Sequence, residues 1–244
     1  MSDTKELVKR NKILERRWKI ALILLILFVV TRPIALYLVK NFINKSAEQA
    51  IKNDYPLIDP ARQFISQENF IINIQALRDY LNELSEKYPN SLSVYYEQLN
   101  SGANIVVNNL SKKDFNDFEQ EIGFQDVFDE NGHASAKEYS RVLRVLYTSS
   151  FLERENSEKI LKLLSQSKFK EFLSNGIPDN LVFAHKYGEN INEKIFADTG
   201  IVYVPNKPYM LTVIFKGKDS SIETKNLAVK LMKEISEKAY EVSK

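Results

Sequence analysis

Cysteine is absent from the 244 residues, and histidine occurs only twice. The absence of cysteine excludes disulfides, thiolate catalysis and thiolate metal sites, and it leaves the redox compartment undetermined. The two histidines, His133 and His185, lie far apart in the sequence and no spaced carboxylate motif accompanies them. We therefore expect neither a zinc site nor any other metal or cofactor.

Charge of one sign is also scarce, because 34 Lys and Arg nearly balance 32 Asp and Glu and leave a net charge of +2. The first 19 residues hold seven Lys and Arg against three acidic residues, so the rest of the chain is slightly acidic. A nucleic-acid-binding domain needs a basic stripe on its folded part, and none is visible. The hydrophobic fraction of 44% is close to that of globular proteins and excludes both a disordered chain and a multi-span membrane protein.

One long apolar run is present, at residues 20–39. A transmembrane helix needs about 20 apolar residues, and Trp18 and Tyr37 bracket the run as interfacial aromatics do. Arg32 and Pro33 interrupt the second half, where the arginine could extend toward the membrane surface. The Lys and Arg before the run predict a cytoplasmic N-terminus, a single-pass cell-membrane anchor and an extracytoplasmic remainder.

A cleaved signal peptide is the competing interpretation of this run. The run is long for a signal peptide, and only Ser46-Ala47 offers a weak cleavage pattern after it. We therefore favour an uncleaved anchor. The predicted organisation is a basic cytoplasmic tail, a transmembrane helix, a stalk or linker and one folded domain, at residues 1–19, 20–39, 40–66 and 67–244.

The folded part predicts an α+β domain, in which helices at both ends flank an antiparallel five-stranded sheet. Apolar spacing and terminal signals, such as the capping box formed by Ser135 and Glu138, predict helices at 69–88, 113–122, 135–146, 156–164, 169–173 and 224–242. Runs rich in β-branched and aromatic residues predict strands at 92–99, 105–107, 181–187, 195–204 and 209–216. Turn residues separate these strands at Asn100-Ser101-Gly102, Gly188-Glu189-Asn190 and Pro205-Asn206.

Four stretches carry a resemblance: VYYEQLNSGANIVVNN at 94–109, ASAKEYSRVLRVLY at 134–147, IPDNLVFAHKYGE at 177–189 and FADTGIVYVPNKPYMLTVIFKG at 196–217. With the order of elements, they resemble the class A β-lactamase family of penicillin-recognising serine hydrolases. The resemblance implies a sheet whose first hairpin is 94–109 and whose last is 196–217. It also implies a β-lactam or a peptidoglycan peptide as the substrate of intact relatives.

The family's catalytic motifs are missing. In the family, a nucleophilic serine in Ser-x-x-Lys opens a helix after the first hairpin, and a Ser-Asp-Asn lies on a later loop. Here the chain runs from Asn109 through Leu110 directly into SKKDFNDFEQEIGF, and no Ser-Asp-Asn occurs. We therefore expect a truncated helical subdomain, no acyl-enzyme chemistry, and an exposed apolar patch at residues 107–118 where that subdomain would lie.

Lys186, Tyr187 and Gly188 occupy the position of the family's Lys-Thr/Ser-Gly strand, whose lysine binds the substrate carboxylate. They are our candidate substrate-binding residues, although tyrosine cannot place a short hydroxyl there. The alternative is a plain edge-strand lysine, with Tyr187 packed against a helix.

The other candidates favour structural or chance interpretations. Glu130 and His133 are interpreted as loop residues and His185 as a strand residue. Ser-x-x-Lys also occurs by letter at Ser165–Lys168 and Ser167–Lys170, either by chance or as part of an unrelated active site.

Two functions remain open from the sequence. The first is a membrane-anchored, catalytically inactive relative of serine β-lactamases. The second is a non-enzymatic extracytoplasmic binding or scaffold module for a protein or cell-wall partner.

Overall fold

The computed structural model describes residues 16–19, 22, 28–29, 31–40, 42, 49–60, 74–110, 136–192 and 194–244. The chain divides into two compact units, Met1–Asp54 and Tyr55–Lys244. Within the described part of the chain, no helix is both long and apolar enough to cross a membrane. Much of the predicted span, including residues 23–27, lies outside the described residues, so the anchor stays a prediction.

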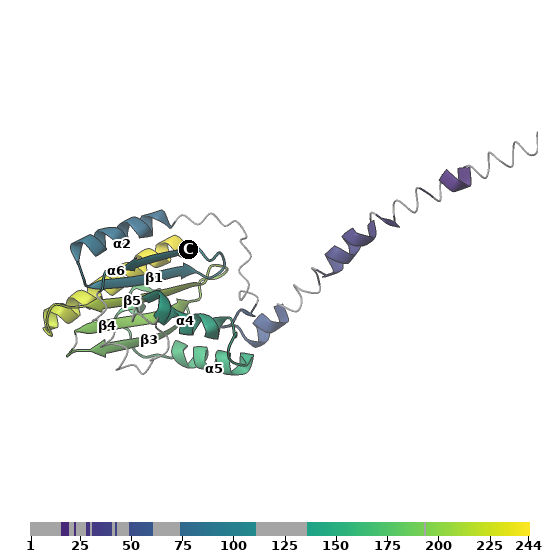
Figure 1. Cartoon of the computed structure of the whole chain (residues 1–244). Coiled ribbons are helices and arrows are strands. Elements are labelled where there is room, and N and C mark those ends of the chain that lie inside the picture. The colour runs from purple at the N-terminus through teal and green to yellow at the C-terminus, as the bar shows by residue number, and fades with distance from the viewer. Residues whose placement is uncertain are drawn as a thin grey trace, which may run out of the picture. The chain divides into compact units, whose positions relative to one another are not determined.

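An antiparallel five-stranded sheet organises the second unit, as predicted (Figure 1). Its strands follow the order β2-β1-β5-β4-β3 across the sheet, so β2 and β3 are the edges. The first hairpin turns at Gly102, whose φ of 71° suits glycine. The strands are β1 (Leu92–Gln98), β2 (Asn104–Asn108), β3 (Phe183–Asn190), β4 (Ile195–Val202) and β5 (Tyr209–Lys216).

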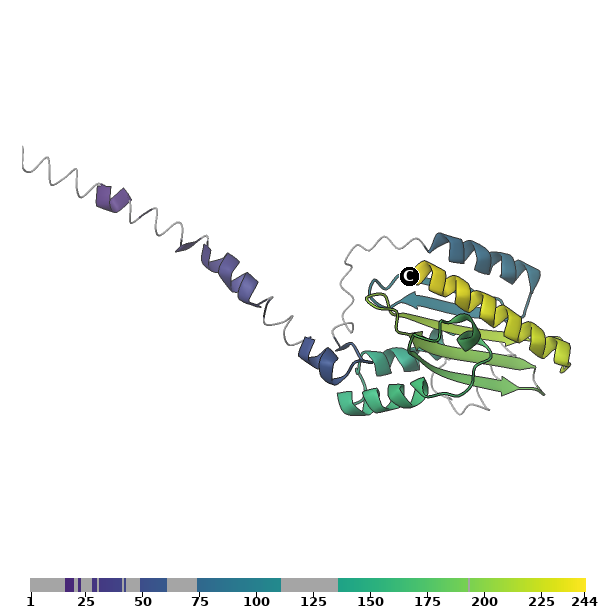
Figure 2. The same ribbon diagram turned by 180° about the vertical axis from the view of Figure 1, so that it is seen from behind.

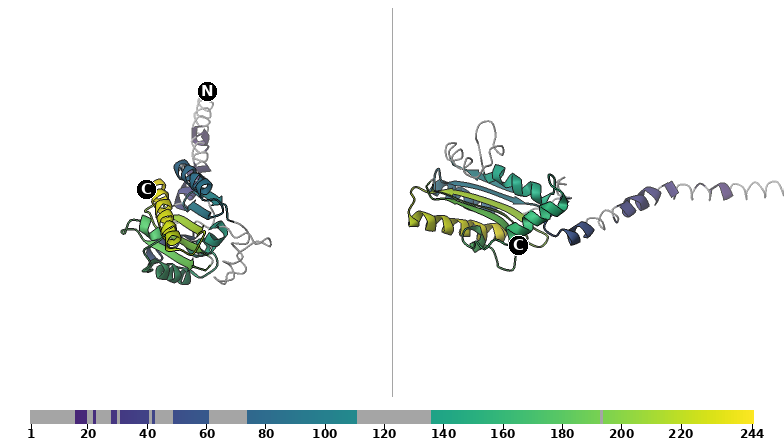
Figure 3. Two further views of the ribbon diagram at one scale, coloured as in Figure 1. Left: turned by 90° about the vertical axis from the view of Figure 1, so that its left-hand side faces the viewer. Right: turned by 90° about the horizontal axis from the view of Figure 1, so that it is seen from below.

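Helices cover both faces of this sheet (Figures 1 and 2; Figure 3, right). The two helices α2 (Gln75–Lys87) and α6 (Ile222–Ser243) pack on one face, and α4 (Ala136–Tyr147) and α5 (Arg154–Ser165) pack on the other. Because strand side chains alternate, β1, β3, β4 and β5 each contribute residues to both cores, whereas β2 contributes only to the core under α2 and α6. The predicted sheet flanked by N- and C-terminal helices is confirmed, and the structure places both of these helices on the same face.

The helices form where their apolar residues repeat with the helical period. In α2, Leu77, Leu81 and Leu84 are all buried against the sheet. Helix α6 begins after Ser221, whose side chain accepts a hydrogen bond from the backbone N–H of Thr224. The apolar side chains thus determine the buried face of α2, and the Ser221 side chain determines where α6 begins.

A short segment before α2 belongs to the second unit. Ile58 is buried, and the backbone N–H of Leu57 donates to Glu158 Oε2 at 3.0 Å. The Tyr203 hydroxyl donates to the carbonyl oxygen of Leu57 at 2.8 Å. These residues fall within the stalk predicted at 40–66, whose boundary at residue 67 stays a prediction.

Two local predictions were wrong. Strand β3 does not end at Tyr187 but continues through Gly188, Glu189 and Asn190, which pair with Ala197, Phe196 and Ile195. The helix predicted at 169–173 is absent, and a 3₁₀ helix, η2 (Leu173–Gly176), follows an irregular stretch instead. Turn-forming residue types led to the wrong end for β3. The helix at 169–173 was predicted wrongly because its aromatic residues pack against other parts of the protein and not along one helix face.

Three further predictions fall wholly or partly outside the described residues. The helix predicted at 113–122 and the capping residue Ser135 lie there, as do residues 111–118 of the predicted apolar patch. Next to that patch, Val106 is 41% exposed on β2, whereas Val107 packs partly against the core under α2 and α6.

Candidate functional site

Lys186 lies on β3, the edge strand, with an exposed side chain. Its ammonium donates a short hydrogen bond to the carbonyl oxygen of Tyr187 and lies 5.0 Å from the centroid of that ring. Among the described carboxylates, none forms an ion pair with Lys186. The charge is therefore available to an anion that approaches the open edge of the sheet.

A row of polar side chains crosses the sheet from this lysine. Lys186 pairs with Thr199, Thr199 with Thr212, and Thr212 with Tyr95, so the four residues lie side by side on four strands. Thr199 and Thr212 are buried, and their hydroxyl oxygens are 2.5 Å apart. We call these four residues the polar row. Strand alternation places it on the face that α4 and α5 cover.

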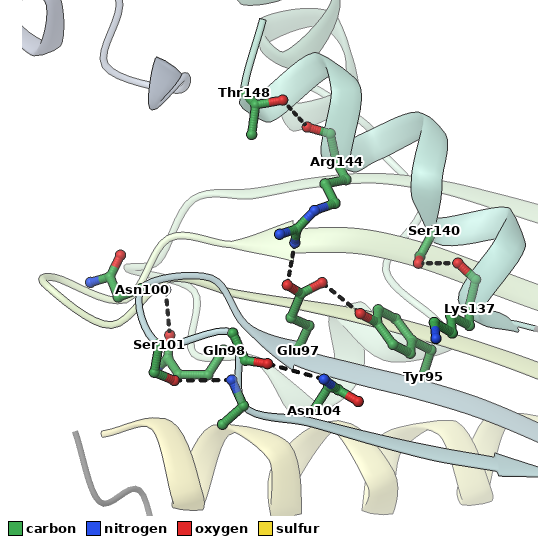
Figure 4. Close-up of polar contacts among 12 residues, drawn as sticks. Tyr95, Glu97, Gln98, Asn100, Ser101, Asn104, Lys137, Ser140, Arg144 and Thr148 are labelled. Carbon is green, nitrogen blue, oxygen red and sulfur yellow. Dashed lines mark hydrogen bonds and ion pairs between the residues drawn. The ribbon is translucent and has the colours of Figure 1, made fainter. Parts of the chain in front are cut away.

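The far end of the polar row meets a buried charge (Figure 4). The Tyr95 hydroxyl donates to Glu97 Oε2 at 2.6 Å, and Arg144 of α4 forms a short ion pair with Glu97 Oε1. Burial, followed by the hydrogen bond to Glu97 and its charge, raises the pKa of Tyr95 well above its usual range. Each carboxylate oxygen thus has a partner within the fold, and through Arg144 the carboxylate contacts α4.

The opposite face of β3 carries a second polar network, which the sequence did not predict. His185 Nδ1 lies 2.9 Å from Asp198 Oδ1 on β4, and His185 Nε2 lies 3.3 Å from the hydroxyl oxygen of Ser174 in η2. The backbone N–H of Leu173 donates to Asp198 Oδ2 at 3.2 Å. His185 is a buried strand residue, as predicted, but it has two specific partners. The pairing of β3 with β4 could have suggested Asp198, whereas no sequence signal points to Ser174.

Tyr187 packs on the same face as His185. Its ring stacks on Phe169, with centroids 3.6 Å apart, and Phe169 lies in the irregular stretch before η2 rather than in a helix. Among the described residues, nothing lies within 4 Å of the position that a Gly188 Cβ would take. Tyr187 also packs edge-on against Phe172, the residue before η2, and only Lys186 of the three candidates presents a polar side chain on the face of the polar row.

The serines of the two Ser-x-x-Lys strings bond to nearby backbone instead of lysine. Ser165 donates to the carbonyl oxygen of Lys162 at 2.8 Å, and Ser167 accepts from the backbone N–H of Phe169 at 3.4 Å. Beside Lys186, no serine hydroxyl of the described residues forms a hydrogen bond with a lysine ammonium. Glu130 and His133 lie outside the described residues.

Comparison with known protein families gives one match, to the β-lactamase enzyme family over residues 110–243, more than half of the chain. The chain belongs to this family. A comparison with curated proteins found no match. The structure is similar to that of PBP-A, at 14% identity and a TM-score of 0.53, over 73% of this chain and 98% of PBP-A.

Two β-lactamase structures are also similar to this member of the β-lactamase family. The TLA-3 extended-spectrum β-lactamase is 13% identical, with a TM-score of 0.53 over 69% of this chain and 98% of TLA-3. The ancestral class A β-lactamase GNCA is 12% identical, with a TM-score of 0.51 over 68% of this chain and 99% of GNCA. These likenesses confirm the fold that the resemblance implied.

Proposed function

We propose that this β-lactamase-family protein is a membrane-tethered binding domain that holds a carboxylate ligand at Lys186 but does not form an acyl-enzyme with it. The ligand class is a β-lactam or a peptidoglycan peptide, as the family resemblance implies. The observation that carries the proposal is the exposed ammonium of Lys186 on the edge strand β3, at the end of the polar row, which forms no ion pair with a described carboxylate.

The proposed loss of acylation rests on missing chemistry. A serine attacks an amide only when a neighbouring base removes its proton. The sequence has no Ser-x-x-Lys directly after the first hairpin and no Ser-Asp-Asn anywhere. The nearest buried carboxylate on the face of the polar row, Glu97, is engaged by Tyr95 and Arg144.

Calorimetric titration of the full chain with benzylpenicillin tests this function. We expect reversible binding that Lys186→Ala weakens by roughly 10-fold or more, because a charge-assisted hydrogen bond contributes about 1.5–3 kcal/mol. Lys168→Ala is the matched control, because Lys168 is an exposed lysine outside β3. Equal affinity of all three proteins, or no binding, would rule out Lys186 as the ligand-binding residue.

A further inference from the structure

A serine, a histidine and an aspartate are connected in series beneath η2, on the sheet face opposite the polar row. The separations are 3.3 Å from Ser174 Oγ to His185 Nε2 and 2.9 Å from His185 Nδ1 to Asp198 Oδ1. This is the order in which a serine, a general base and an orienting carboxylate are connected in serine hydrolases. We propose that Ser174 is an activated nucleophile, with His185 as its base and Asp198 as the positioning carboxylate, toward small activated acyl esters and fluorophosphonates.

The Asp198 carboxylate fixes the orientation of the His185 imidazole. Asp198 is completely buried, and its second oxygen accepts the backbone N–H of Leu173 at 3.2 Å. Burial raises the pKa of Asp198, and the hydrogen bonds from His185 and the backbone N–H of Leu173 oppose that rise. In its ionised form the carboxylate is only an acceptor, so the Nδ1 atom that faces it then carries the ring proton. In the neutral ring, the Nε2 lone pair then points at the Ser174 hydroxyl. That is the tautomer a general base needs.

Packing holds the histidine in this orientation. The Phe183 ring stacks on the imidazole at a centroid separation of 4.4 Å and an interplanar angle of 13°. Gly200, on the neighbouring strand, leaves room for both rings, because a Cβ there would lie 2.6 Å from the Cβ of His185. The ring therefore has little freedom to turn away from Ser174.

Ser174 differs from its two partners in being partly exposed, whereas His185 and Asp198 are buried. The proposal therefore requires that a small reagent reach this partly exposed residue, which the labelling experiment below measures directly. The hydroxyl has a second acceptor, the carbonyl oxygen of Phe169 at 3.2 Å, so its single proton is shared between Nε2 and this carbonyl.

With a fluorophosphonate, we expect the serine to displace fluoride. Ser174 Oγ attacks phosphorus, the P–O bond forms, the P–F bond breaks, and fluoride leaves. The hydroxyl proton passes to His185 Nε2. With an acyl ester, the proton returns from Nε2 to the leaving alcohol, and water then releases the acid from the serine ester by the same steps.

The full chain, incubated with a biotinylated fluorophosphonate and digested for mass spectrometry, tests the proposal. We expect one modified serine, Ser174, and loss of the label in Ser174→Ala. Ser165→Ala is the matched control, since Ser165 bonds only to local backbone, and it should label as the parent does. His185→Gln should slow labelling by roughly 100-fold or more, the contribution of a positioned general base.

Because His185 is buried, circular dichroism and thermal unfolding of each variant must first show a native fold. Ser174→Ala removes one oxygen atom, so it keeps the test decisive if His185→Gln does not fold. Absence of any label, or a label that Ser174→Ala leaves unchanged, would overturn the proposal and make the network structural only. The test is independent of the ligand proposed for Lys186, which lies on the other face of β3.

Discussion

The Glu97 carboxylate is buried and forms an ion pair with Arg144. The Glu97 side chain is 4% exposed and that of Arg144 is 29% exposed, so the pair lies at the border of the core. Removing one partner of such a pair leaves a buried charge without compensation. The pair therefore adds to the buried residues of α4, such as Leu143 and Tyr147, in holding this helix on the sheet.

We predict that Arg144→Met lowers the free energy of unfolding by about 2–3 kcal/mol, below the ~3–5 kcal/mol of a fully buried pair because water reaches the arginine. Lys159→Met is the control, because its ion pair with Glu155 has both side chains more than half exposed. That change should leave the free energy of unfolding close to the parent value, because solvent screens an exposed pair. Urea unfolding measures both, and equal losses would contradict the role of Arg144.

Two glycines of neighbouring strands provide a second residue-scale test. A Cβ on Gly200 would collide with His185 and with the ring of Phe183, whereas nothing lies within 4 Å of the corresponding position on Gly188. We predict that Gly200→Ala destabilises the protein by about 1–3 kcal/mol, the usual cost of overpacking. Gly188→Ala should change stability by less than about 0.5 kcal/mol in the same thermal unfolding assay. A larger loss at Gly188 would contradict this packing.

At the scale of elements, the start of α6 predicts a pH effect. Hydrogen bonds from Ser221 and Thr224 lower the pKa of Asp219 from 3.8 to about 2. A carboxyl whose pKa is lower in the folded state stabilises the protein above its unfolded pKa, and that contribution is lost as the pH falls through the folded value. Asp219 therefore stabilises the protein above about pH 4.

We predict that Asp219→Asn is less stable than the parent at pH 5 and that the difference shrinks as the pH falls toward 2. Thermal unfolding between these pH values measures it. Ser220→Ala, next to the helix cap, should show the same difference from the parent at every pH. A stability gap for Asp219→Asn that does not change with pH would exclude ionised Asp219 as the cause.

The sequence predicts elements well where local chemistry and tertiary packing agree. The first hairpin was predicted because Asn100-Ser101-Gly102 forms a turn between two β-rich runs. The end of β3 was missed because Gly188 and Asn190 are turn formers, yet pairing with β4 keeps them extended. The helix at 169–173 was predicted wrongly, because Phe169 stacks on Tyr187, a contact between residues far apart in the sequence.

The candidate site was predicted only in part, for the same reason. Lys186 could be located because the surrounding string resembles a family motif. The partners of His185 could not, since Ser174 and Asp198 come from separate elements that meet only in the folded protein. The spacing of these residues along the chain does not show that they come together in the folded protein.

At the scale of the whole molecule, we predict that residues 20–39 anchor the protein in a membrane. The full chain should remain in the membrane pellet after alkaline carbonate, because about 20 apolar residues bury a complete helix in the bilayer. A variant that lacks residues 1–19 should behave in the same way, whereas a variant that lacks residues 1–39 should be released. Release of the full chain by carbonate would contradict the anchor.

We propose that this member of the β-lactamase family binds its ligand without acylation. Intact-mass spectrometry after prolonged incubation with benzylpenicillin tests it most directly, with an active class A β-lactamase blocked in deacylation as the positive control. We predict that the mass of this protein stays unchanged while the control gains one penicilloyl group. A stoichiometric mass increase of this protein, by one penicilloyl group, would contradict the account.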